Sequence, residues 1–143
     1  MLFVLLTGLF LNGCAYPEDI TVVVEAPTQA TVGEPFELIV KIKNESSEPQ
    51  TLISIDVGTD YLEGILLEES TPAYVQSWSF DLLGFMSFDY KMEVAPGESL
   101  EVVYLMNPFN PGDYSGSVDV CINNEMDCVY NIVRTVVEQA DSN

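Results

Sequence analysis

Apolar and polar residues alternate along most of this chain, and this period of two constrains the fold more than any other feature. Phe36, Leu38, Val40 and Ile42 alternate with Glu37, Lys41 and Lys43. Successive side chains of a β-strand point to opposite faces, so this pattern predicts a strand with one buried face and one hydrated face. Similar runs occur at 20–24, 53–57, 88–94, 100–106 and 118–122, and the last leads into a hairpin that ends near Val137.

Turn-forming residues separate these runs. Glycine, proline, asparagine and serine gather at 32–35, 44–49, 95–97 and 110–113. No stretch has convincing helical periodicity. Eight or so short strands predict an all-β fold, an antiparallel two-sheet sandwich over 20–138, with 139–143 as a C-terminal tail.

The composition limits the classes of function that the chain can have. The 143 residues are 48% hydrophobic, which suits one domain with its own core. There are 23 Asp and Glu against 4 Lys and Arg, a net charge of −19, which excludes electrostatic capture of nucleic acid or anionic lipid. The chain has no histidine, so it lacks the usual general base at neutral pH and the commonest zinc ligand.

The first residues are predicted to act as an export signal. Positions 1–11 are almost entirely apolar but too short to span a bilayer, which takes about 20 residues, so they read as the core of a signal peptide. The following Leu11-Asn12-Gly13-Cys14 resembles the lipobox of bacterial lipoproteins. That resemblance implies a signal peptide at 1–13, acylation of the Cys14 thiol (with palmitate among the acyl chains) and a tether at 14–19. The alternative is a buried N-terminal strand with an ordinary packed Cys14.

Cysteine number agrees with that interpretation. Three cysteines leave one unpaired in an exported protein, and lipidation of Cys14 would leave Cys121 and Cys128. Both lie in strand-like runs around a turn at Asn124 and Glu125, where hairpin pairing brings them opposite each other and within reach of a disulfide. Closing this loop is worth about 2.5 kcal/mol on the loop-entropy model. A redox or zinc site is the weaker alternative, because the spacing is not Cys-x-x-Cys and histidine is missing.

Longer segments resemble the immunoglobulin-like modules of bacterial surface and exported proteins. The resemblance is carried by 31–44, 48–52, 94–100 and 111–116. It implies an immunoglobulin-like antiparallel sandwich, with Tyr114 as the corner tyrosine that hydrogen-bonds to the backbone. Antibody domains join their two sheets by a disulfide, whereas Cys121 and Cys128 would join neighbouring strands of one sheet.

The segment 74–88 is the most aromatic and the least regular. Tyr74, Trp78 and Phe80 are candidate ligand-binding residues that would form an aromatic platform for a sugar or a peptide. The alternative is that they cover the core or a sheet edge.

Motifs for metal binding and catalysis are weak. Asp56, Asp60 and Glu63 lie close enough in sequence to suggest calcium, but without EF-hand spacing, so a solvated acidic face is the preferred interpretation. We expect no cofactor and no metal. Nucleophile-elbow, phosphate-loop and dinucleotide motifs are missing from the sequence. A catalytic Ser-Lys dyad that uses Lys41, Lys43 or Lys91 is a remaining alternative, although the strand pattern predicts that Lys41 and Lys43 face outward.

These features together predict a non-enzymatic, lipid-anchored protein of the bacterial cell envelope, on the extracytoplasmic side of a membrane. Its domain would serve as an interaction or structural accessory module with an unknown protein or carbohydrate partner and no nucleic acid. The alternatives are a carbohydrate- or peptide-binding module built on Trp78, and a protease inhibitor.

Overall fold

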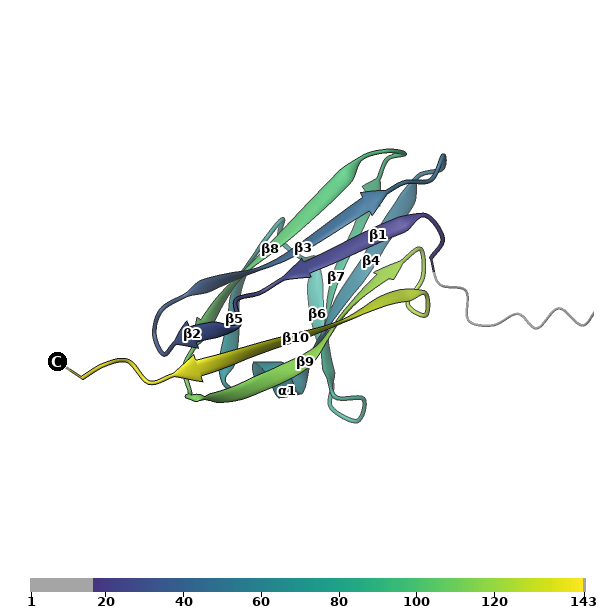
Figure 1. Ribbon diagram of the computed structural model, residues 1–143. Coiled ribbons are helices and arrows are strands. Elements are labelled where there is room, and N and C mark those ends of the chain that lie inside the picture. The colour runs from purple at the N-terminus through teal and green to yellow at the C-terminus, as the bar shows by residue number, and fades with distance from the viewer. Residues whose placement is uncertain (1–16, 143) are drawn as a thin grey trace, which may run out of the picture.

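The computed structural model describes residues 17–142, and positions 1–16, with the lipobox and Cys14, lie outside the described residues. Two β-sheets face each other, and a one-turn helix, α1, connects the fourth strand of the chain to the fifth (Figure 1). The elements in chain order are β1 (Ile20–Glu25), β2 (Gln29–Thr31), β3 (Phe36–Asn44), β4 (Gln50–Gly58), α1 (Thr59–Leu62), β5 (Ile65–Thr71), β6 (Gln76–Phe80), β7 (Phe85–Val94), β8 (Ser99–Pro108), β9 (Gly112–Ile122) and β10 (Cys128–Glu138).

The two-sheet sandwich expected from the alternating pattern is confirmed, with one difference in strand direction. The smaller sheet has the order β1-β3-β8-β5 and the larger one the order β2-β10-β9-β4-β7-β6. Neighbouring strands are antiparallel except β2, which runs parallel to β10. After β1 the chain crosses from the smaller sheet to the larger, where the Val136 amide donates to the Thr28 carbonyl at 2.9 Å. The parallel pair arises because this crossover does not reverse the chain.

The core lies between the two sheets and takes alternate residues from each strand. Leu38, Val40 and Ile42 of β3 are fully buried, while Glu37 and Lys41 on the opposite face of the strand are exposed. Other buried members are Leu52, Ile55, Val57, Phe88, Tyr90, Val102, Tyr104, Met106, Val118, Val120 and Ile122. Burial of this apolar surface, at about 25 cal/mol per Å², is the main stabilising contribution to the fold.

A β-bulge interrupts the expected alternation of β4. The register shifts between Leu52 and Ser54, so Leu52 and Ile55 both face the core. Ile53, which simple alternation places on the core side with Ile55, instead lies on the opposite face. Because a bulge inserts one extra residue into a strand, the side chains before it change face.

The expected corner tyrosine is present in the structure. The Tyr114 hydroxyl donates to the carbonyl oxygen of Pro111 at 3.2 Å, and its ring packs against the core. The ring lies over Gly64, where a Cβ atom would stand 2.0 Å from the ring. Only a glycine fits at position 64 with the tyrosine in this place.

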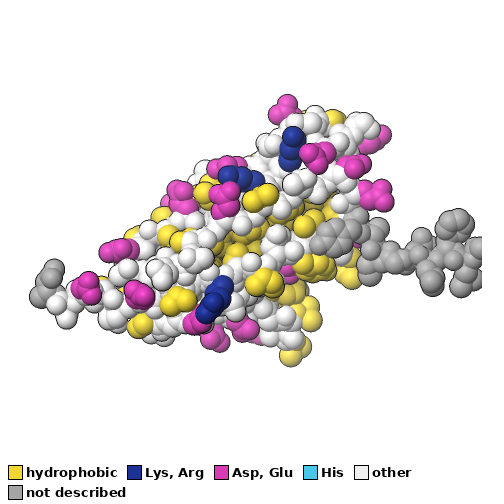
Figure 2. All heavy atoms as spheres, in the orientation of Figure 1, with side chains coloured by type: hydrophobic (Ala, Val, Ile, Leu, Met, Phe, Trp, Pro, Cys, Tyr) yellow, Lys and Arg dark blue, Asp and Glu magenta, His cyan; other side chains and the backbone are white. Residues whose placement is uncertain are grey.

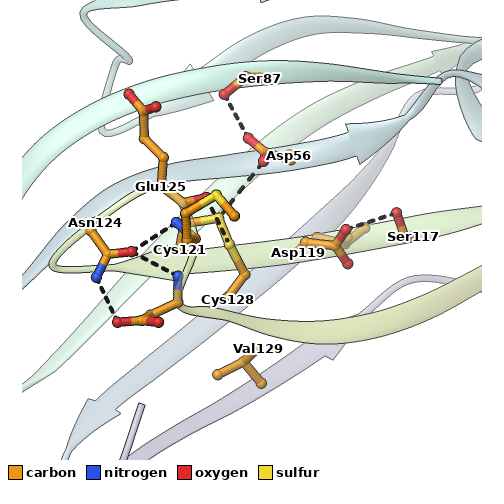
Figure 3. Close-up of a disulfide and its surroundings, with 12 residues drawn as sticks. Asp56, Ser87, Ser117, Asp119, Cys121, Asn124, Glu125, Cys128 and Val129 are labelled. Carbon is orange, nitrogen blue, oxygen red and sulfur yellow. Dashed lines mark hydrogen bonds between the residues drawn. A yellow bond between two sulfur atoms is a disulfide. The ribbon is translucent and has the colours of Figure 1, made fainter. Parts of the chain in front are cut away.

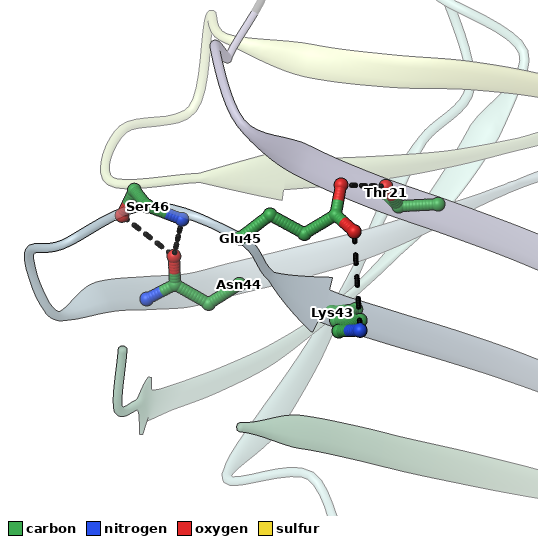
Figure 4. Close-up of polar contacts among 5 residues, drawn as sticks. All are labelled: Thr21, Lys43, Asn44, Glu45 and Ser46. Carbon is green, nitrogen blue, oxygen red and sulfur yellow. Dashed lines mark hydrogen bonds and ion pairs between the residues drawn. The ribbon is translucent and has the colours of Figure 1, made fainter. Parts of the chain in front are cut away.

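Asn44 anchors the β3–β4 turn from a fully buried position (Figure 4). Its side-chain amide donates to the carbonyls of Glu48 (2.7 Å) and Val94 (2.9 Å), and its carbonyl oxygen accepts from the Ser46 amide (3.0 Å). The asparagine therefore uses both amide hydrogens inside the protein. On the surface beside it, Glu45 accepts a hydrogen bond from Thr21 at 2.9 Å.

Candidate functional site

A groove of about 520 Å³ crosses the outer face of the six-stranded sheet, the face turned away from the core. Strands β4 and β7 form its floor, because Asp56 of β4 and Ser87, Asp89 and Lys91 of β7 all lie on this face. One wall is aromatic and comes from β6, with Trp78 and Phe80. The other wall is the β9–β10 turn, with Glu125 and Met126. The groove thus combines apolar walls with a floor that carries carboxylates.

Two aspartates of the floor are held by side-chain hydrogen bonds. Asp89 accepts from the indole Nε1 of Trp78 at 3.1 Å and from the side-chain amide of Gln76 at 2.8 Å. Asp56, from β4, accepts from the hydroxyl of Ser87. The indole of Trp78 is therefore fixed in orientation while 52% of the residue stays exposed. An exposed, pre-positioned aromatic ring loses little conformational freedom when a ligand packs on it.

A second acidic residue stands next to Asp56. Asp119 of β9 lies directly opposite it in the β4–β9 pair, and its buried Oδ1 atom has no hydrogen-bond partner among residues 17–142. Burial raises the pKa of Asp56 above its ordinary value, and the hydrogen bond from Ser87 offsets this in part. Burial also raises the pKa of Asp119, and the negative charge of Asp56 adds to the increase. The sheet therefore carries two half-buried acidic groups that repel each other.

The disulfide expected from the cysteine spacing is present and supports one wall of the groove (Figure 3). Cys121 and Cys128 are direct partners in the β9–β10 register, with an S–S distance of 2.03 Å. It joins neighbouring strands of one sheet, and Cys121 Sγ lies 3.7 Å from Asp56 Oδ2. A disulfide sulfur carries no hydrogen, so this last approach is a packing contact. The bond closes the turn that carries Glu125 and Met126.

The three aromatic residues singled out in the sequence do not lie together. Trp78 and Phe80 face the groove. The ring of Tyr74 instead packs edge-on against the buried Phe88, with 5.1 Å between ring centroids, and belongs to the margin of the core. Phe80 is next to Phe85 at 5.1 Å, and both rings line the groove. The aromatic surface is therefore built from β6 and the start of β7.

The turn between β6 and β7 extends this apolar surface beyond the sheet. Leu82 is 103% exposed and Leu83 is 70% exposed. Figure 2 shows hydrophobic side chains gathered on the projecting end of the molecule below the sandwich, on a surface otherwise rich in acidic groups. The Thr59 amide donates to the Gly84 carbonyl at 2.9 Å and holds this turn at the α1 end of the domain.

The acidic residues considered for metal binding lie on different elements of the fold. Asp56 faces the groove, whereas Asp60 lies in α1 and Glu63 follows it. Between residues 17 and 142 there is no group of three or more Cys, Asp or Glu side chains placed to hold a metal ion. Lys41 donates to Glu25 at 3.0 Å, and this bond and the charge of Glu25 raise the lysine pKa. A lysine that acts as a general base needs its pKa lowered instead.

No helix within residues 17–142 is long and apolar enough to cross a bilayer. The groove on the six-stranded sheet brings exposed aromatic rings and carboxylates together, and it is the described feature best suited to binding.

Comparison with solved structures shows the immunoglobulin-like fold. A domain of Escherichia coli alpha-2-macroglobulin in its native conformation matches with a TM-score of 0.59 and 14% identity, over 85% of this chain and 7% of the macroglobulin. The CARDB domain of a Pyrococcus furiosus protein, solved with di-metal ions, matches with a TM-score of 0.50 and 16% identity, over 92% and 100% of the two chains. A cohesin module of a Clostridium perfringens glycoside hydrolase matches with a TM-score of 0.50 and 14% identity, over 85% and 97%.

These similarities concern the fold. The chain spans only a small part of the macroglobulin that it matches, and all three identities are low. No protein-family model matches the sequence, and no curated protein does. The fold is immunoglobulin-like, and because one fold can host many functions, the function of this chain depends on the chemistry of its site.

Proposed function

We propose that this chain is an exported, lipid-anchored protein of the bacterial cell envelope whose immunoglobulin-like domain is a non-enzymatic interaction module. Cys14 is the proposed site of lipidation, the signal peptide is 1–13, and 14–19 is a short tether to the domain at 20–138. The outer-face groove, with Trp78 and Phe80, is the proposed binding surface.

The pairing of Cys121 with Cys128 carries the proposal of export and anchoring. Structural disulfides form in oxidising compartments outside the cytosol. With these two cysteines joined, Cys14 is the one cysteine left over, and it lies in the lipobox-like sequence. Two or three acyl chains at about 0.8 kcal/mol per buried methylene would hold a soluble domain durably on a bilayer.

The chain enters the domain at the end opposite the exposed aromatic surface, and this supports a role in which the anchored domain presents that surface to a partner. The Glu45 amide donates to the Asp19 carbonyl at 2.8 Å, so the chain enters the domain beside the β3–β4 turn. The β6–β7 turn lies past the other end of β4, which has nine residues. At about 3.3 Å per residue, the length of β4 separates the β3–β4 turn from the β6–β7 turn by about 26 Å. An anchor at Cys14 would leave the exposed aromatic end facing away from the membrane.

Cell fractionation tests the anchoring. The full chain and its Cys14→Ser variant are expressed in a bacterium that processes lipoproteins, with Cys128→Ser as the matched control. We expect the native chain and the control in the membrane fraction, released by detergent but not by salt, and Cys14→Ser in the soluble fraction. A native chain found in the soluble fraction, or a Cys14→Ser variant that stays on the membrane, would refute the anchor.

A further inference from the structure

We propose that the outer-face groove binds an extended segment of a partner protein that carries arginine or lysine side chains between apolar ones. This inference rests on the proposed interaction function and names the chemistry of the partner. Its support comes from the charge, walls and position of the groove.

The carboxylates of the groove lack a positive partner in the described part of the chain. Asp56, Asp89 and Glu125 line it. The ion pairs among residues 17–142 join Lys41 to Glu25, Lys43 to Glu45 and Arg134 to Asp113, all away from the groove. Lys91 lines the groove but lies in none of these pairs. Three carboxylates against one ammonium group leave the groove negative, so a cation from outside is the complementary ligand.

The apolar walls suit the stem of a long basic side chain. An arginine or lysine buries its methylene groups on apolar surface and keeps its charged end in a polar place. Trp78 offers an exposed ring face for that stem and for a cation–π contact, and Met126 faces it from the other wall. Asp56 lies on the floor between them, where it can accept hydrogen bonds from the charged end.

Neighbouring apolar residues of the partner would pack on the surface next to the groove. Phe80, Leu83 and Phe85 continue the apolar wall toward the β6–β7 turn. An exposed apolar surface beside a charged groove is typical of sites that bind proteins. The partner segment is therefore expected to be mixed, with basic and apolar side chains, rather than simply polybasic.

Other occupants fit less well. A second copy of this chain would bring its own net charge of −19 against the first. A neutral sugar can stack on Trp78, but it leaves the carboxylates of the floor without a counter-charge. A membrane of anionic lipids is repelled for the same reason as a second copy.

Fluorescence of Trp78 tests the inference directly, because it is the one tryptophan of the sequence. The probe is a capped pentapeptide of alternating leucine and arginine, titrated into the full processed protein in detergent. The same peptide with glutamate in place of arginine is the charge control, and cellohexaose is the sugar control. Asp56→Asn tests the floor, and Glu37→Gln, an exposed acid on the other sheet, is the matched variant.

We expect a saturable shift of the Trp78 emission with the arginine peptide, unchanged in Glu37→Gln, weakened about tenfold in Asp56→Asn and weakened further by salt. Glutamate peptide and cellohexaose should produce no shift. The inference is overturned by a missing response to the arginine peptide, by an equal response to the glutamate peptide, by an affinity that Asp56→Asn leaves unchanged, or by saturation with cellohexaose. Cell fractionation of the native chain and Cys14→Ser is a separate measurement. If the native chain is membrane-bound but the peptide titration fails, this inference is refuted and the proposal of a lipid-anchored protein is not.

Discussion

Asp56 and Asp119 lie directly opposite each other on β4 and β9, on the outer face of the six-stranded sheet. Both carboxyl groups have a pKa above the ordinary value of 3.8. Over the pH range just above 3.8 the folded chain keeps protons that the unfolded chain has lost, so the free energy of unfolding falls as pH rises through that range. We expect the melting temperature to be higher near pH 4 than at pH 7.5. A higher melting temperature at pH 7.5 would contradict this.

Replacing Asp119 tests whether the pair of Asp56 and Asp119 causes this pH dependence of the melting temperature. Asp119→Asn removes a repulsive cross-strand contact and a buried charge, so we expect it to raise the free energy of unfolding at pH 7.5 by about 1 kcal/mol. The pH dependence of the melting temperature should become shallower. Glu37→Gln removes the same charge from an exposed site and should change the stability far less. Chemical denaturation at both pH values measures the difference, and equal effects of the two variants would remove the special role of Asp119.

The contact between Gly64 and Tyr114 predicts a strongly coupled pair. Gly64→Ala would place a methyl group 2.0 Å from the tyrosine ring. We expect a loss of about 1–3 kcal/mol from this overpacking, measured by urea denaturation. In a Tyr114→Ala background the same change should cost much less, since the ring is gone. Additive effects of the two substitutions would show that Tyr114 does not occupy this place.

Replacing Asn44 by aspartate should destabilise the fold far more than the similar shapes of the two side chains suggest. In Asn44→Asp a carboxylate would replace the amide that donates to the carbonyls of Glu48 and Val94. We expect a loss of more than about 3 kcal/mol at pH 7.5, because the buried charge then faces two acceptors. Acidification should restore part of the stability by protonating the carboxyl. Thr21→Ala, at an exposed hydrogen bond of the same region, is the control and should cost little.

The disulfide should matter both for stability and for the groove. Replacing Cys121 and Cys128 together by serine should lower the free energy of unfolding by about 2.5 kcal/mol. The turn with Glu125 and Met126 should then be cut faster by protease than in the native chain. Limited proteolysis with mass spectrometry locates the cut. An unchanged cleavage rate would mean that the strands alone hold the turn.

Much of the fold was predictable from local patterns in the sequence. Burial of Leu38, Val40 and Ile42 follows from period two. The Cys121–Cys128 pair follows from equal spacing around the turn at Asn124 and Glu125. Both features depend on residues that are close in sequence, where strand and turn chemistry suffice.

The features that depend on distant pairing were not predictable. The outward position of Ile53 comes from a bulge, which apolar spacing does not reveal. The opposition of Asp56 and Asp119 needs the register of β4 on β9, two strands about sixty positions apart. The contact of Trp78 with Asp89 is local, 11 positions apart, but Tyr74, whose spacing suggested that it shares the Trp78 surface, turns its ring to the buried Phe88 instead. Register between strands far apart in sequence is set by packing of the whole core.

Mass spectrometry of the mature protein, purified with detergent from its native host, tests the anchored module most directly. The proposal predicts an N-terminus that begins at Cys14 and carries a diacylglyceryl group on the sulfur, with Cys121 and Cys128 still joined. A mature chain that retains residues 1–13, or one in which Cys14 is present with a free thiol, would contradict it.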